Sequence, residues 1–160
     1  MSDITINEIT EADRGRIKQC ILGRWKTERM VSKGRLYQPG DHKGFIAQAD
    51  GEIKGLITYE KLVRDIEITL LQRDIPSLGI AARLTELVIK KAKEEGVRRV
   101  WAVTTNDNTP AMHFYQKNGF DMVQLHYNAL LKSRQLKPEI PATGFADIPI
   151  KHELEFEIRL

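Results

Sequence analysis

The sequence predicts a single α+β domain, with mixed α/β character, over residues 1–160. Its 160 residues are the size of one domain, and neither an internal repeat nor a linker divides them. Hydrophobic residues make up 41% and charged residues 29%, which is the mix of an ordinary globular protein. Stretches with a period of two are interspersed with stretches whose apolar residues recur every three or four positions. These patterns predict the element order β-α-β-β-β-α-β-α-β-β.

The first half of the chain predicts a strand and a helix, followed by an antiparallel meander. A Thr/Ile-rich run at residues 4–9 predicts the first strand. Residues 26–43 are polar and contain proline and glycine, which predicts the helix end and a long loop. Asp50-Gly51 then separates two β-rich runs, and this dipeptide is typical of a two-residue hairpin turn. Residues 66–71 predict the last strand of the meander.

The second half begins with a change of period. Residues 80–92 carry apolar side chains every three or four positions and basic side chains between them, which predicts an amphipathic helix. Residues 97–105 are rich in β-branched residues and predict a strand. Thr109-Pro110 predicts a helix start, with Thr109 as the cap and proline at the first helical position, where it is favoured.

The C-terminal part predicts one more pair of strands. Residues 120–127 predict a strand, and residues 132–150, with three prolines and a glycine, predict mostly loop. From residue 153 onward, glutamates alternate with Leu154, Phe156 and other apolar residues. This alternation predicts a final strand with one buried face and one solvated face.

Charge and cysteine content exclude several classes of protein. The 25 basic and 22 acidic residues leave a net charge of only +3. A nucleic-acid-binding protein would be expected to have a larger basic excess, with its basic residues gathered on one element. A lone cysteine, Cys20, excludes an internal disulfide and fits a reducing compartment. No apolar stretch approaches the roughly 18 residues of a membrane helix, and the N-terminal residues lack signal-peptide features. We therefore expect a cytoplasmic protein with no membrane or nucleic-acid partner.

The turn that precedes the helix at residues 80–92 is a candidate anion site. Backbone N–H groups at a helix start point outward, and with the helix dipole they favour a phosphate. Gly79 and Ala81 keep the first turn free of bulky side chains. Many helices begin in this way and bind nothing, so this feature alone favours a purely structural turn.

The segment from Asn108 to Phe120 is far more specific. Its sequence, NTPAMHFYQKNGF, fits the pattern N-x-x-A-x-x-F-Y-x-K-x-G-F at every marked position. In this segment the protein resembles the GNAT N-acetyltransferase superfamily, whose signature helix carries that pattern. Residues 31–35, 44–47, 131–141 and 148–150 are similar to a bacterial subgroup of uncharacterised members. The resemblance implies the GNAT fold: a mostly antiparallel mixed sheet of about seven strands, flanked by helices and splayed between strands 4 and 5.

The resemblance also implies an acetyl-CoA site. Gly79 and Ala81 match the family loop Q/R-x-x-G-x-G/A, whereas Pro76 stands where Gln or Arg is usual. Proline has no N–H, so one pyrophosphate contact would be absent. Leu71 matches the strand end that binds pantetheine and the thioester, and Asn108 matches the asparagine that bonds the pantetheine arm. The residues expected to hold the pyrophosphate are Ser77, Leu78, Gly79, Ile80, Ala81 and Ala82.

The implied reaction is transfer of an acetyl group from acetyl-CoA to an amine, by direct attack in a ternary complex. Tyr115 matches the family tyrosine that faces the CoA sulfur and acts as the general acid. A phenol with a pKa near 10 is protonated at neutral pH and can donate without tuning. The alternative for Tyr115 is a core aromatic residue whose hydroxyl has a purely structural partner.

Two residues compete for the role of general base. Glu67 occupies the strand position at which several family members carry a catalytic glutamate, and by alternation Glu67, Thr69 and Leu71 should share a face. A solvated strand glutamate is the equal alternative. His126 is the rival base, because its intrinsic pKa is suitable. We assign no role to His42 or His113, and no Cys/His/carboxylate spacing predicts a metal site.

These observations favour an N-acetyltransferase over a GNAT-like module that senses acyl-CoA without transferring the acyl group. The retained Tyr115 and Asn108 discriminate, because a degenerate module has little reason to keep the acid. The acceptor is expected to be a small-molecule or peptide amine, selected by residues 26–43 and 132–149. The oligomeric state is left open, a homodimer included.

Overall fold

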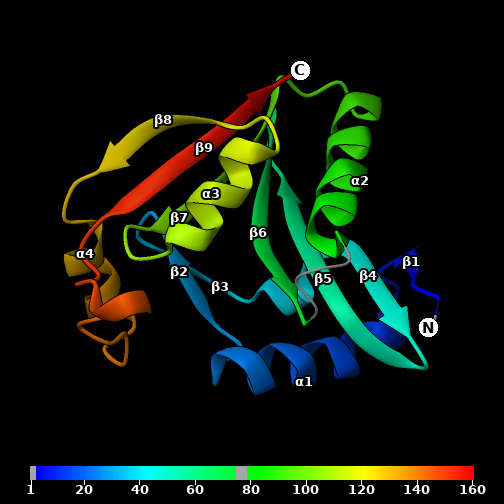
Figure 1. Ribbon diagram of the computed structural model, residues 1–160, viewed down its shortest axis with the longest axis horizontal. Coiled ribbons are helices and arrows are strands. Elements are labelled where there is room, and N and C mark those ends of the chain that lie inside the picture. Colours follow the sequence, from blue (N-terminus) through cyan, green and yellow to red (C-terminus); the bar gives the residue numbers. More distant parts are fainter. Residues whose placement is uncertain (1–2, 75–78) are drawn as a thin grey trace. The chain divides into compact units, whose positions relative to one another are not determined.

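A computed structural model describes residues 3–74 and 79–160, and the chain forms two compact units (Figure 1). The first unit comprises Met1–Arg29, Gln38–Val100 and Leu160. The second comprises Met30–Tyr37 and Trp101–Arg159. The segment Met30–Tyr37 thus belongs with the C-terminal residues, although it lies early in the sequence.

The first unit is built on four antiparallel strands in the order β1-β4-β5-β6. These strands are β1 (Thr5–Glu8), β4 (Lys43–Ala49), β5 (Glu52–Lys61) and β6 (Asp65–Arg73). Its α-helices are α1 (Arg14–Trp25) and α2 (Ile80–Glu94), and its 3-10 turns are η1 (Glu11–Asp13) and η2 (Pro39–Asp41). The predicted hairpin is confirmed: Asp50 and Gly51 both have positive φ, and Ala49 pairs with Glu52.

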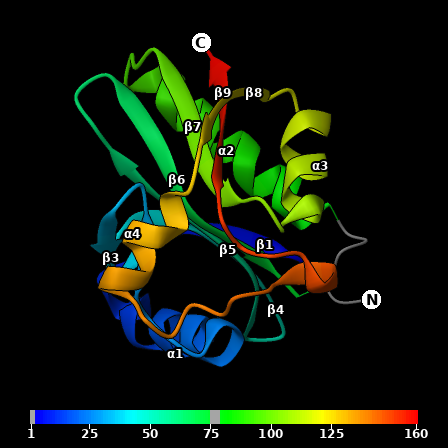
Figure 2. The same ribbon diagram turned by 90° about the vertical axis from the view of Figure 1, so that its left-hand side faces the viewer.

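The helices α1 and α2 cover opposite faces of this sheet (Figures 1 and 2). A Cβ at Gly55 of β5 would meet Ile80 and Leu84 of α2, so that face of β5 carries α2. The side chain of Gln72 on β6 accepts a hydrogen bond from Trp25 Nε1 of α1 at 2.9 Å, on the other face. Ile80 and Leu84 are fully buried, which confirms the amphipathic helix read from the sequence.

The second unit contains three strands of the main sheet in the order β7-β9-β8 and a separate hairpin. The hairpin is β2 (Met30–Ser32) with β3 (Arg35–Tyr37), and the sheet strands are β7 (Arg99–Thr105, which begins in the first unit), β8 (Asp121–His126) and β9 (Glu153–Arg159). The helices are α3 (Thr109–Lys117) and α4 (Ala129–Leu136), followed by the 3-10 turn η4 (Phe145–Asp147). Figure 2 shows α4 and the segment that follows it, both drawn in orange, which connect β8 to β9 along the chain.

Two segments predicted as loops contain short regular elements. The β2–β3 hairpin lies within residues 26–43; each of its strands has three residues, too few to show a period of two. Its turn residues Lys33 and Gly34 both have positive φ. Helix α4 begins at Ala129 and extends into the segment predicted as loop from residue 132, and only Leu130 and Ser133 of its eight residues are buried.

The prediction that β9 has one solvated face is wrong. Glu153, Glu155 and Glu157 are only 2%, 3% and 8% exposed. For Glu153 and Glu155 the reason is that a segment distant in sequence covers them: Lys33 donates from its backbone N to Glu153 Oε1 at 3.0 Å and from Nζ to Glu155 Oε1 at 3.1 Å. Alternation correctly gave the two faces of β9, but it could not show that a hairpin packs on the polar one.

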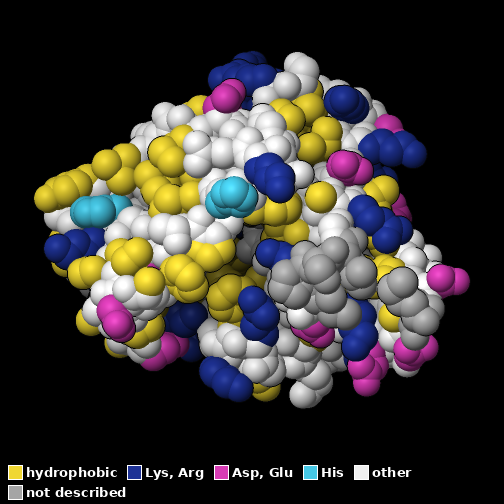
Figure 3. Space-filling model, viewed as in Figure 1, with side chains coloured by type: hydrophobic (Ala, Val, Ile, Leu, Met, Phe, Trp, Pro, Cys, Tyr) yellow, Lys and Arg dark blue, Asp and Glu magenta, His cyan; other side chains and the backbone are white. Residues whose placement is uncertain are grey.

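The two units together carry the seven main-sheet strands that were predicted, mostly antiparallel and accompanied by helices, so the fold class is confirmed. A single domain and a splay between strands 4 and 5 stay predictions. Figure 3 shows Lys and Arg dispersed among Asp and Glu on the face viewed. Among the residues described, no helix is both long enough and apolar enough to span a membrane.

Candidate functional site

In the first unit, the start of α2 has the properties of an anion site. Gly79 is the N-cap, in the left-handed region with φ of +64°, and a Cβ on it would meet no described atom within 4 Å. The first hydrogen bond of the helix runs from Arg83 N to Gly79 O. The N–H groups of Ile80, Ala81 and Ala82 therefore lack intrahelical acceptors. The predicted site residues Ser77 and Leu78, together with Pro76, lie outside the described residues.

Strand β6 carries an irregularity that re-aims its side chains. Leu70 pairs with Thr58 and Ile68 with Tyr59, so Thr69 is an extra residue opposite this step of β5. This β-bulge shifts the alternation of β6 by one residue. Bulges of this kind are common beside active sites, where they redirect a side chain.

The predicted shared face of Glu67, Thr69 and Leu71 is therefore wrong for Leu71. Leu71 pairs with Ile57, which lies two residues from Gly55 and so faces α2. Glu67 pairs with Glu60, two residues beyond Thr58 and on the face opposite α2. The bulge sends Leu71 toward the α2 face, and it places Glu67, which is 4% exposed, on the α1 face.

A histidine to which the sequence assigned no role lies on this same face. His42 Nδ1 lies 2.8 Å from Thr69 Oγ1, which lies 2.8 Å from Thr58 Oγ1. The other ring nitrogen, Nε2, is 3.5 Å from Glu60 Oε2. His42 thus joins the side-chain network at the bulge. Because the contact bridges 27 residues from a loop without a motif, no local pattern in the sequence could have revealed it.

The backbone around His42 is held by α1. The Arg14 guanidinium donates from Nη1 to the carbonyl oxygens of Gly40 and His42. The hydrogen bond from Arg14 fixes the backbone of His42, and its imidazole, which is 16% exposed, packs against β5 and β6. In the first unit, then, His42 contacts both Thr69 and Glu60, and Glu67 lies on the same α1 face of the sheet.

In the second unit, Asn108 begins α3. Its side chain, as N-cap, accepts a hydrogen bond from Ala111 N at 3.2 Å, so the cap is Asn108 and not Thr109 as predicted. Within the described residues its amide nitrogen has no protein partner. This leaves a donor for a ligand while the amide oxygen stabilises the helix.

Tyr115 points into an aromatic cluster. It is 7% exposed, and its ring centroid lies 5.5 Å from that of Phe156 and 5.2 Å from that of Phe120. Burial raises the pKa of the Tyr115 phenol far above its usual value, because the phenolate would be poorly solvated. The residue is therefore both a packed core aromatic and a group that keeps its proton at any ordinary pH.

The rival base His126 is part of an ion network. Its Nε2 lies 3.1 Å from Glu155 Oε1, and the same carboxylate oxygen accepts from Lys33 Nζ. Lys33 Nζ also lies 4.7 Å from the centroid of the Trp101 ring. Burial raises the pKa of the neighbouring Glu153 carboxyl, although the Lys33 backbone N–H offsets part of this effect. His113, in contrast, is exposed on α3.

Asp107, a buried carboxylate next to the start of α3, was not predicted from the sequence. Asp107 is 8% exposed; its Oδ1 accepts from the Thr105 hydroxyl and its Oδ2 accepts from Phe145 N at 3.0 Å. A Cβ at Gly144 would lie 2.0 Å from Asp107 Oδ2, so any larger residue there would displace this carboxylate. Asp107 thus ties the β7–α3 turn to the C-terminal segment. Across residues 3–74 and 79–160, no three His, Cys, Asp or Glu are grouped to hold a metal ion.

Comparison with known proteins gives one matching family model, described as the acetyltransferase (GNAT) family, over residues 10–120. The chain is 38% identical over 133 residues to the uncharacterized protein YdhI of Bacillus subtilis (strain 168), covering 82% of this chain and 83% of that protein. Among solved structures, a GNAT family acetyltransferase from Elizabethkingia anophelis with acetyl-CoA bound is similar, with a TM-score of 0.68 and 18% identity over 98% of each chain. The ribosomal-protein-S18-alanine N-acetyltransferase from Escherichia coli is also similar, with a TM-score of 0.68 and 12% identity over 98% of this chain and 94% of that one.

Proposed function

The chain belongs to the acetyltransferase (GNAT) family, and from this premise we propose that it transfers an acetyl group from acetyl-CoA to a primary amine of a small molecule or peptide. The observation that carries the proposal is the segment from Asn108 to Phe120, which matches the family signature and folds with Asn108 as cap and Tyr115 buried. A module that only senses acyl-CoA would have little reason to keep the acid, Tyr115.

The residues present fit acetyl-CoA, which supplies the acetyl group as a thioester. The backbone N–H groups of Gly79, Ile80, Ala81 and Ala82 would bind the pyrophosphate, and the fit rests on the free space beside Gly79 and on the unbonded first turn of α2. Ile80 and Ala81 are buried and contribute through their backbone. Leu71 and the Asn108 amide nitrogen would contact the pantetheine arm. Ser77 and Leu78 stay predictions of the family resemblance.

Two side chains would move protons. Tyr115 holds a proton at Oη and would donate it to the departing sulfur. Glu67 would accept the proton of the amine, with Thr69 and His42 beside it on the same face of β6. His126 remains the rival base, and its pairing with Glu155 argues for a role in the ion network instead.

The direct test is release of free thiol from acetyl-CoA by the purified chain with polyamines, aminoglycosides, amino acids and peptides with free N-termini. We expect at least one amine to raise thiol release well above the rate without acceptor, and the acetylated amine should be recovered by mass spectrometry. Acetyl-CoA binding without release for any amine would favour the sensing module instead.

Glu67→Gln is expected to lower kcat by about 100-fold, the lower end of the usual general-base contribution. The loss should be greatest at pH values below the pKa of the acceptor amine, where a proton must be removed, and acetyl-CoA affinity should change little. Glu52→Gln, on the exposed start of β5, is the matched control and should keep full activity. A pH–rate profile unchanged by Glu67→Gln, but stripped of its acidic limb by His126→Ala, would assign the base to His126.

A further inference from the structure

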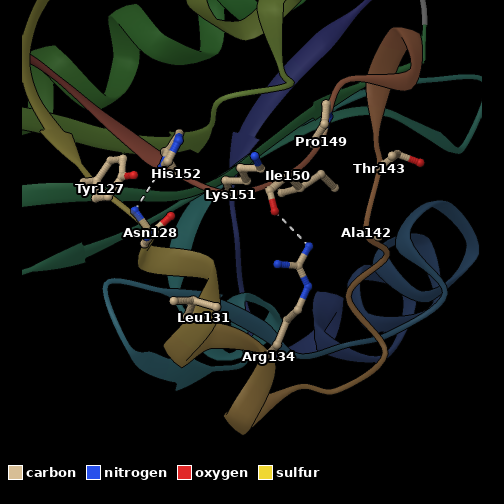
Figure 4. Close-up of a pocket in the computed structure, with 10 residues that line it drawn as sticks. All are labelled: Tyr127, Asn128, Leu131, Arg134, Ala142, Thr143, Pro149, Ile150, Lys151 and His152. Atoms are coloured by element: carbon tan, nitrogen blue, oxygen red, sulfur yellow. Dashed lines mark hydrogen bonds between the residues drawn. The ribbon is translucent and has the colours of Figure 1, made fainter.

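The second unit contains an open pocket of about 630 Å³ that has no part in the site described above (Figure 4). It lies between α4 and the segment that leads into β9 (Figure 4). Its volume falls within the range of small-molecule sites, roughly 300–1,000 Å³. The lining residues that bear on its chemistry are Tyr127, Leu131, Arg134, Ile150, Lys151 and His152.

The walls of this pocket are fixed by hydrogen bonds. Arg134 of α4 donates from Nη2 to Pro141 O at 2.7 Å and to Ile150 O at 2.8 Å. From the other side, Asn106 accepts from the backbone N of both Lys151 and His152 through Oδ1, at 2.8 and 2.9 Å. The pocket is therefore held open by the fold, and a ligand would not have to order it.

The lining carries positive charge without a counter-charge. Arg134 bonds only to carbonyl oxygens among the described residues, and these are neutral. Lys151 is exposed, and within the described part of the chain its ammonium has no carboxylate partner. No Asp or Glu lines the pocket. Two cations with no carboxylate between them favour an anionic ligand, and the Nη1 group of Arg134, which bonds to no described residue, is left to donate to it.

A third donor is defined by the tautomer of His152. Its Nδ1 accepts a hydrogen bond from Asn128 N at 2.9 Å, which fixes the ring proton on Nε2. Figure 4 shows this bond, with Tyr127 beside the imidazole. The two rings stack at a centroid distance of 4.8 Å and an angle of 18°, and Tyr127 is 74% exposed. The stack therefore offers a flat apolar face next to an N–H donor.

We propose that this pocket binds an organic carboxylate with an aromatic or apolar body. The carboxylate would be held by Lys151, Arg134 and the His152 Nε2–H group, and the body would lie against Tyr127 and Leu131. Leu131 is 66% exposed, so contact with a ligand would remove apolar surface from water. This site goes beyond the proposed acetyl transfer. The carboxylate either belongs to the amine acceptor itself or to a separate ligand.

The test uses three probes with the same body and different charge: phenylacetate, 2-phenylethanol and 2-phenylethylamine. Binding to the full chain is followed by NMR through the His152 ring signals, without acetyl-CoA. We expect phenylacetate to bind at least tenfold more tightly than the neutral alcohol, and the cationic amine to bind most weakly. Lys151→Gln should weaken phenylacetate about fivefold, and Tyr127→Ala should weaken all three probes. Lys117→Gln, an exposed lysine of α3 outside the pocket, is the matched control.

Equal affinity for the three probes, or phenylacetate affinity unchanged in Lys151→Gln, would overturn the assignment. Thiol-release assays then distinguish the two sources of the carboxylate. If the acceptor supplies it, phenylacetate should compete with the amine, and Lys151→Gln should raise KM for the amine without changing kcat. If a separate ligand supplies it, the KM for the amine should not respond to phenylacetate. Because the NMR arm needs no catalysis, a failure of the proposed function would leave this result intact.

Discussion

Gly79→Leu is expected to abolish most acetyl-CoA binding, with Kd raised at least 100-fold, or about 2.7 kcal/mol at 1.36 kcal/mol per decade. A Cβ at this position meets no described atom within 4 Å, so the leucine side chain would enter the space that a pyrophosphate would need. It would also sit at the first N–H groups of α2, where the anion is stabilised. Isothermal titration calorimetry with acetyl-CoA measures the loss directly.

The matched control separates bulk from backbone strain. Gly79 has φ of +64°, a conformation that costs any L-residue with a Cβ about 1–2 kcal/mol. Gly79→Ala carries the same strain without the bulk, so both variants should lose similar thermal stability, whereas only the leucine variant should lose most of its affinity. Equal affinities of the wild type and the leucine variant would remove the start of α2 from the site.

Patterns within one element predicted most of the fold. The amphipathic period of α2, the Asp50-Gly51 turn and the β-rich runs gave the main-sheet strands, because each of these signals is contained in fewer than 20 consecutive residues. The β2–β3 hairpin was missed because each of its strands has only three residues, too few to establish a period of two. The burial of Glu153 was missed for another reason: its partner Lys33 lies 120 positions earlier in the chain.

In the candidate site, too, residues within one contiguous motif could be predicted, whereas contacts between distant segments could not. Asn108 and Tyr115 could be predicted because they stand in one contiguous signature, and the structure places one as the cap of α3 and the other in its buried face. The orientation of Leu71 could not be predicted, because strict alternation fails at a bulge, and the bulge depends on the pairing of β5 with β6. The contact of His42 with Thr69 could not be predicted either, because it depends on a loop and a strand that lie together only in the folded protein.

Tyr115→Phe is expected to lower kcat about 100-fold while acetyl-CoA affinity and folding change little. The variant keeps the ring that stacks on Phe156 and removes one hydroxyl, for which the described residues provide no hydrogen-bond partner. General acid catalysis contributes about 10²–10⁴-fold, and the CoA thiolate is already a fair leaving group, so the lower end applies. The free energy of unfolding should change by no more than about 0.5 kcal/mol. Tyr59→Phe, at another buried tyrosine, should leave kcat unchanged.

The pH dependence of this loss follows from the burial of Tyr115. Burial disfavours the charged phenolate, which raises the pKa of the phenol, so the proton stays on Oη through neutral and moderately alkaline pH. The wild type should therefore show no alkaline decline caused by Tyr115 below about pH 10, the ordinary phenol pKa. The ratio of wild-type to variant kcat should stay constant over that range. A variant with full turnover, or a ratio that falls toward one between pH 7 and pH 9, would mean that water or another group protonates the sulfur.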